Sequence, residues 1–131
     1  MDQKRQPSGF GDFRAPLYEV KANLFKGLAH PVRIRVLELL SASPEVSVSD
    51  LLSATGLEAS HLSQHLSVLR RYRLVTSDRR GLQQFYTLAD PLVAELLAVA
   101  RGLLENMLQV TKVNLESAVP PGPSPAARDT Q

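Results

Sequence analysis

The sequence predicts a mainly α-helical domain with one small β-hairpin. Leucines and valines recur at helical spacing over most of the chain, two short β-prone runs flank a polar turn near residue 80, and proline or glycine separates the successive segments. The chain has 131 residues, of which 44% are hydrophobic and 21% charged. This length and composition are typical of one globular domain with a single core.

The two ends of the chain are expected to be tails. Residues 1–14 mix glycine, proline and charge without a period, and residues 117–131 are rich in proline, serine and alanine. Neither composition supplies enough apolar surface to offset the entropy lost on ordering. We therefore predict disordered tails at 1–14 and 114–131 and a folded domain at 15–113.

Two helices are predicted at the start of the domain. Leu17, Leu24 and other apolar residues at spacings of three and four predict a helix over about 17–28. Pro31 suits the first position of a second helix, "PVRIRVLELL", and His30 is expected to cap it. That helix has too many apolar positions for one stripe, so it should be central in the core.

Two short helices joined by a tight turn are predicted next. Ser47, followed by Asp50 three residues later, resembles a capping box and starts a helix that Gly56 ends. After a turn of about three residues, a second helix is expected over about 59–72. This pair fits the helix-turn-helix pattern.

The hairpin and a long helix complete the predicted domain. The runs "RLVTSD" and "LQQFYTL" are joined by a polar turn with Gly81, and Pro91 opens a helix over about 91–113. The apolar surface of this last helix is broader than a small core needs, so a partner chain could cover the excess. The order of elements is that of a winged helix-turn-helix domain.

Positive charge is concentrated on the 59–72 helix and the hairpin. Residues 59–88 hold five arginines against Asp78 alone, a net charge of +4. Residues 1–58 balance seven basic residues with seven acidic ones, and residues 89–131 hold three against five. A local positive excess of this kind indicates a surface that meets a polyanion.

One face of the 59–72 helix is chemically suited to the DNA major groove. Ala59, Leu62, Leu66 and Leu69 share the face expected to pack in the core. Small hydroxyls allow close approach, glutamine can pair with adenine, and arginine can pair with guanine or phosphate. A solvated polar surface is the alternative, which the adjacent basic hairpin disfavours. The polar face holds Ser60, Ser63, Gln64, Ser67 and Arg71.

Metal binding and catalysis are not expected. His61 and His65 have the i, i+4 spacing of a helical zinc site, but zinc needs at least three protein ligands, the chain has no cysteine, and the nearest acidic residue is Glu58. We instead expect His61 near DNA and His65 against the preceding helix. The chain also has no glycine-rich loop after a strand and no carboxylate or nucleophile constellation, so no cofactor and no enzyme activity are predicted.

The chain is expected to be soluble and cytoplasmic. Its longest apolar runs fall short of the roughly 20 residues that span a bilayer, and no apolar signal segment follows Met1. We therefore expect no membrane partner. Without cysteines, thiol redox sensing is excluded as well.

Three segments resemble the arsenic-repressor (ArsR/SmtB) family of dimeric winged-helix transcriptional regulators: "LFKGLAHPVRIRVLELL", "SVSDLLSATGLEASHLSQHLSVLRRYRLV" and "RRGLQQFYTL". The resemblance covers about residues 17–108. It implies a homodimeric repressor on double-stranded DNA, with major-groove contacts from Ser60, His61, Ser63 and Gln64, a supporting contact from Arg70, and wing contacts from Arg79, Arg80 and Gln83. It also implies a two-fold interface built from the first and last helices, to which we assign Leu17, Val20, Leu24, Leu92, Leu96, Val99, Leu103 and Met107.

The departures from the family pattern concern metal ligands and one helix end. Metal-sensing members carry Cys-Val-Cys-Asp where this chain has the segment 47–50, Ser-Val-Ser-Asp. The second family site keeps Asp90, but Leu92, Leu103 and Asn106 follow it, so neither metal site can be assembled. Tyr72-Arg73 replaces the usual Ala-Gly, which leaves the 59–72 helix without its left-handed terminating glycine.

Two questions stay open from the sequence. A winged helix used for protein association, with a solvated basic patch, is the alternative to DNA binding. The effector that would switch DNA affinity is not identified. Core packing is the expected role of Tyr18, Phe25, Tyr72 and Met107, and an apolar ligand pocket is the alternative.

Overall fold

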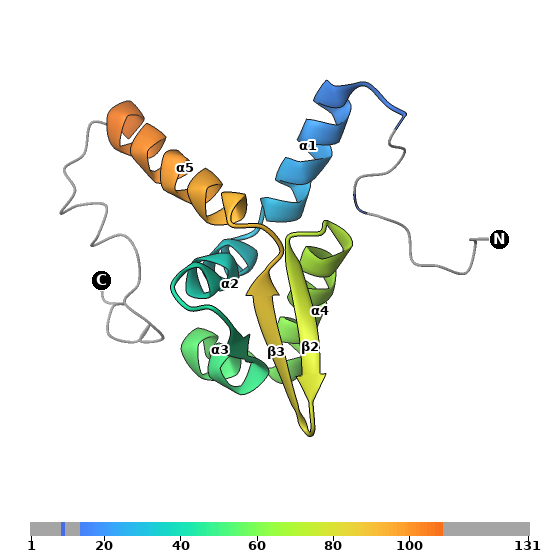
Figure 1. Ribbon diagram of the computed structural model, residues 1–131. Helices are drawn as coiled ribbons and strands as arrows, with labels where there is room; N and C mark the ends of the chain where they lie inside the picture. The colour runs from blue at the N-terminus through green and yellow to red at the C-terminus, as the bar shows by residue number, and fades with distance from the viewer. Residues whose placement is uncertain (1–8, 10–13, 109–131) are drawn as a thin grey trace.

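The computed structural model describes residue 9 and residues 14–108 and confirms the winged helix-turn-helix fold (Figure 1). Apart from Gly9 and Arg14, the tails expected at 1–14 and 114–131 lie outside the described residues, as does the predicted end of the last helix at 113. The elements in chain order are α1 (Leu17–Leu28), α2 (Pro31–Ser41), β1 (Val46–Ser47), α3 (Val48–Thr55), α4 (Ala59–Arg71), β2 (Val75–Arg80), β3 (Gln83–Leu88) and α5 (Leu92–Leu108).

The sheet contains the predicted hairpin and one strand that the sequence did not predict. Strands β2 and β3 pair antiparallel from Val75 opposite Leu88 to Arg80 opposite Gln83. Gly81 opens the two-residue turn with a φ of 64°, a conformation that glycine adopts without steric cost. The extra strand, β1, pairs with the outer edge of β3, and its two residues are too few to show an alternating pattern.

The core is built around α2 and α4. Val36, Leu37 and Leu40 of α2 are buried, which confirms its predicted central position. The predicted core face of α4 is confirmed at its three leucines and wrong at Ala59, which is exposed. Ala59 is the first residue of the helix, between exposed Glu58 and Ser60, and so lies beyond the edge of the core. The buried leucines of α4 are Leu62, Leu66 and Leu69.

The predicted caps of α2 and α3 are confirmed. The Nδ1 atom of His30 accepts a hydrogen bond from the backbone N–H of Val32 at 3.1 Å. At the start of α3, the Ser47 hydroxyl accepts one from the backbone N–H of Asp50 at 3.0 Å. Gly56 ends α3 in the left-handed conformation, with a φ of 73°. These local signals therefore set the starts of α2 and α3, and Gly56 sets the beginning of the turn that leads into α4.

The end of α4 keeps a left-handed terminator although the glycine is missing. Arg73 has a φ of 59°, and the backbone N–H of Leu74 donates to the Leu69 carbonyl at 2.9 Å. The preceding residue, Tyr72, packs against glycine in α1, since a Cβ atom at Gly27 would lie 2.4 Å from the Tyr72 ring. The substitution of Ala-Gly by Tyr-Arg thus keeps the helix end and adds a contact between α4 and α1.

Helices α1 and α5 extend away from α2 in different directions (Figure 1). Their outer faces are exposed, as at Val99 (67%) and Met107 (64%), because no other described element covers them. The expected core roles of Tyr18, Phe25 and Met107 are therefore wrong, whereas Tyr72 packs against the core as predicted. In the described part of the chain, no helix is long and apolar enough to cross a membrane.

Candidate nucleic-acid interface

The buried leucines of α4 set its rotation, and its polar face is consequently turned outward. Leu62, Leu66 and Leu69 are nearly inaccessible. Ser60, His61, Ser63 and Gln64 are exposed, and Ser67 and Arg71, further along the same helix, are half-buried. The residues predicted to read base edges thus lie together on the solvent side of one helix.

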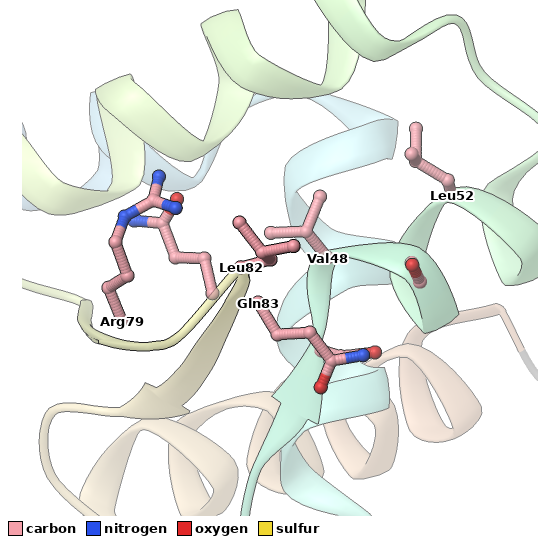
Figure 2. Close-up of a pocket in the computed structure, with 8 residues that line it drawn as sticks. Val48, Leu52, Arg79, Leu82 and Gln83 are labelled. Carbon is pink, nitrogen blue, oxygen red and sulfur yellow. The ribbon is translucent and has the colours of Figure 1, made fainter.

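The hairpin supplies a second polar surface beside α3. Arg79 and Gln83 are exposed near its turn, and Leu82 within the turn is 98% exposed. Figure 2 shows Arg79, Leu82 and Gln83 of this wing around a pocket of about 260 Å³, with Val48 on α3 forming part of its wall. The wing residues predicted to contact DNA are therefore brought together near the start of the helix-turn-helix.

Arg80, unlike Arg79, is paired with an acidic side chain of the protein. Its Nη2 atom donates to both carboxylate oxygens of Glu45 at 2.7 Å, and its guanidinium lies 4.0 Å from the centre of the Phe85 ring. The hydrogen bond to Glu45, with the charges of Glu45 and Asp78, raises the pKa of Arg80. Among the described residues, Arg79 has no ion-pair partner, so it contributes the wing's unshared positive charge.

Arg70 fastens α4 to the sheet. Its Nη1 atom donates to the hydroxyl of Tyr86 at 2.6 Å, and Tyr86 is buried at the centre of β3. This contact links α4 directly to β3 of the hairpin. The sequence predicted a supporting role for Arg70 but contained no signal for its partner, or for the pairing of Arg80 with Glu45, because both partners are distant in the chain.

His65 joins α4 to the start of α2. Its ring centre lies 4.2 Å from that of His30, and its Nδ1 atom is 3.4 Å from Nη1 of Arg33. Arg33 in turn donates to the Gly27 carbonyl at 2.8 Å. Burial lowers the pKa of His65, and His30, Arg33 and His61 lower it further. The prediction that His65 packs against α3 is corrected: the neighbours that contact it or act on its charge are His30 at the cap of α2, Arg33 on α2 and His61 on α4 itself.

No metal centre is formed by the side chains of residue 9 and residues 14–108. They contain no group of three or more His, Asp or Glu residues placed to hold an ion. Ser47 and Ser49 line the pocket beside the wing. The chemistry of the site is thus hydrogen bonding and positive charge.

An exposed polar helix held against a protruding basic hairpin defines a winged helix-turn-helix transcriptional regulator. Residues 30–77 match the model of the bacterial regulatory protein, arsR family. The helix-turn-helix transcriptional regulator Rv0081 of Mycobacterium tuberculosis (strain H37Rv) is 54% identical over 94 residues, which cover 71% of this chain and 82% of the relative. The chain belongs to the arsR family.

Solved structures agree with this assignment. The crystal structure of M. tuberculosis Rv0081 matches with a TM-score of 0.67 and 53% identity, over 72% of this chain and 95% of that one. The solution structure of the homodimeric winged helix-turn-helix DNA-binding domain Mb0332 from Mycobacterium bovis, described as a possible ArsR-family transcriptional regulator, matches with a TM-score of 0.63 and 32% identity. This second match covers 72% of this chain and 87% of that one.

Proposed function

We propose that the protein is a homodimeric repressor that binds an inverted-repeat operator. Helix α4 enters the major groove and the wing lies on the backbone or in the minor groove. The observation that carries this proposal is the separation of two surfaces: the polar face of α4 and the wing on one, and the exposed apolar faces of α1 and α5 on the other. One surface suits a polyanion and the other suits a second copy of the chain.

Dimerisation through α1 and α5 determines the spacing of the two reading helices. In a two-fold dimer, α4 and its partner copy must lie about 34 Å apart to enter successive major grooves on one side of the duplex. The half-sites are then one helical turn apart. The interface residues are those assigned from the sequence, of which Leu17, Leu92, Val99, Leu103 and Met107 are more than half exposed in the single chain.

The contacts divide into base reading and backbone binding. Ser60, Ser63 and Gln64 of α4 read bases, and His61 supports them. Arg79 and Gln83 of the wing bind phosphates or the minor groove, whereas Arg80 contributes less because Glu45 holds it. Ser67, Arg70 and Arg71 support the backbone contacts. Each phosphate contact releases counterions, so affinity should fall steeply with salt.

Two substitutions test this division of roles. Gln64→Ala should lower affinity for the operator by about 1–3 kcal/mol and leave affinity for a scrambled duplex unchanged. Arg79→Ala should weaken binding to both duplexes alike, because a phosphate contact is independent of sequence. Gel-shift titrations on operator and scrambled duplexes measure both effects. Arg101→Ala, an exposed arginine on α5, is the matched control and should change neither affinity.

The outcomes separate this function from its alternatives. Equal losses for Gln64→Ala and Arg79→Ala on both duplexes would refute the division of roles. No retardation of mixed genomic DNA at low salt would favour a protein-association module instead.

The proposed domain that binds DNA and dimerises comprises residues 15–113. In this proposal the protein acts by binding alone, without catalysis or a cofactor, and it works in the cytoplasm.

A further inference from the structure

An apolar pocket of about 570 Å³ opens between α1, α2 and α5. Its volume is within the range of about 300–1,000 Å³ that is usual for small-molecule sites. Phe25, which the sequence placed in the core, is 55% exposed at this pocket. The walls include Phe25 and Leu28 of α1, Ile34 of α2, Leu97 and Ala100 of α5, and one polar side chain, that of His30.

The pocket borders the proposed dimer interface and shares Leu96 with it. Leu97 and Ala100 belong to the face of α5 that adjoins the outer face of Leu92, Val99 and Leu103, as the helical spacing requires. A second copy seated on the outer face therefore lies next to the pocket. A molecule inside it would contact both α1 and α5, the two helices through which the proposed dimer forms.

Among the described residues that line the pocket, His30 is the one whose side chain can donate a hydrogen bond. Its Nδ1 atom accepts from the Val32 N–H, so the neutral ring carries its proton on Nε2. The other described lining residues present apolar side chains. A ligand that fits this lining has an apolar body and one group that accepts a hydrogen bond.

The same histidine is in contact with the reading helix. The His30 ring packs on the His65 ring of α4, and Arg33 lies between His65 and the end of α1. His61 and Gln64, which face outward, are within one turn of His65 on that helix. A shift of His30 would therefore act on His65 of α4, and a shift of His65 would act through Arg33 on the Gly27 carbonyl at the end of α1.

We propose that this pocket binds an apolar small molecule with one group that accepts a hydrogen bond, and that binding lowers DNA affinity through the contact of His30 with His65. The effect on DNA rests on the proposed function, whereas the binding site does not. A ligand has this effect only if it binds more tightly to the conformation with lower DNA affinity.

Binding is tested without DNA through Ile34, the single isoleucine of the chain. Its ¹³C-labelled methyl group gives one signal inside the pocket. Decanoate should shift that signal saturably, and decyltrimethylammonium, which has the same tail and no acceptor, should bind at least tenfold more weakly. Ala100→Phe fills the pocket and should abolish the shift. Ala98→Phe, on an exposed position of α5 outside the pocket, is the matched control and should retain it.

Coupling is tested by DNA titrations with and without decanoate. Decanoate should lower operator affinity by about fivefold or more in the native protein and in Ala98→Phe, and should have no effect in Ala100→Phe. His65→Gln should still show the Ile34 shift, but the ratio of the two DNA affinities should approach one.

Several results would overturn the proposal. If neither probe shifts the Ile34 signal, or if Ala100→Phe responds like Ala98→Phe, the pocket is not a binding site. Equal affinities for decanoate and decyltrimethylammonium would show that His30 does not donate a hydrogen bond to the ligand. If decanoate no longer changes the DNA affinity of His65→Gln and also no longer shifts its Ile34 signal, the effect on DNA cannot be assigned to the contact between His30 and His65. Because the Ile34 signal is read without DNA, a failure of DNA binding leaves the pocket assignment standing.

Discussion

Arg73 holds a backbone conformation that glycine usually occupies at the end of a helix. Its φ of 59° costs an L-residue about 1–2 kcal/mol. Arg73→Gly removes that cost, but the greater conformational freedom of glycine in the unfolded chain offsets about 0.5–1 kcal/mol of the gain. The free energy of unfolding should therefore rise by up to about 1.5 kcal/mol. Denaturant unfolding measures the change.

The matched control for this prediction is Arg71→Gly. Arg71 is the last residue of α4 and has helical geometry, so glycine there should lower the free energy of unfolding by up to about 1 kcal/mol. Destabilisation by Arg73→Gly would mean that side-chain contacts of Arg73 outweigh its backbone cost.

In the proposed complex, Glu45 competes with DNA phosphates for Arg80. Glu45→Gln removes the carboxylate that Arg80 contacts at 2.7 Å and removes one negative charge beside the wing. Affinity for operator and scrambled duplexes should rise together, and the slope of log affinity against log salt should steepen by about one. Binding titrations over a series of salt concentrations give that slope.

Glu105→Gln is the matched control for the wing. Glu105 pairs with Arg101 on α5, at 3.5 Å, and its substitution should leave the salt slope as it is in the native protein. An unchanged slope in Glu45→Gln would show that Phe85 and Asp78 hold Arg80 without Glu45.

At the scale of elements, we expect His65 to make the packing of α4 on α2 dependent on pH. Its pKa lies below the ordinary 6.5, mainly because burial disfavours the charged ring. The neutral ring therefore contributes stability that is complete above about pH 6.5 and is lost as the pH falls through the lowered pKa. The native protein should lose free energy of unfolding between about pH 7 and pH 5, and His65→Gln should lose less.

Chemical unfolding at these two pH values checks the prediction. His61→Gln, on the exposed side of the same helix, is the control and should keep most of the native pH dependence. If both variants respond alike, the pH dependence arises elsewhere in the molecule.

At the scale of the whole molecule, the proposed function places a second copy of the chain against the exposed apolar faces of α1 and α5. Leu103 is 55% exposed in the single chain, so Leu103→Glu should leave the protomer folded. A charge in the apolar interface should shift the protein toward monomer and lower operator affinity at the same time. Sedimentation equilibrium gives the first quantity and gel shifts give the second.

Ala98→Glu is the corresponding control, because Ala98 is exposed on α5 and is not among the residues assigned to the interface. A Leu103→Glu protein that remains a dimer with native operator affinity would place the interface elsewhere. Circular dichroism of both variants separates a loss of association from a loss of folding.

Much of the fold was predictable because its signals are local. The caps at His30 and Ser47, the stop at Gly56 and the turn at Gly81 depend on residues within a few positions of each other, and they set the element boundaries. The polar face of α4 followed from helical spacing alone. Strand β1 was missed because two residues carry no periodicity, and the core roles of Tyr18, Phe25 and Met107 were wrong because periodicity does not show whether another element covers a face.

By itself, the sequence determined the order of the elements, the outward face of α4 and the absence of the family's thiolate ligands, since spacing and residue type decide each of these. Only the tertiary structure decided which arginine of the wing is paired, how His65 meets His30, and that Phe25 borders a pocket. These contacts join residues far apart in the chain. Their distances depend on how whole helices pack, which no local pattern encodes.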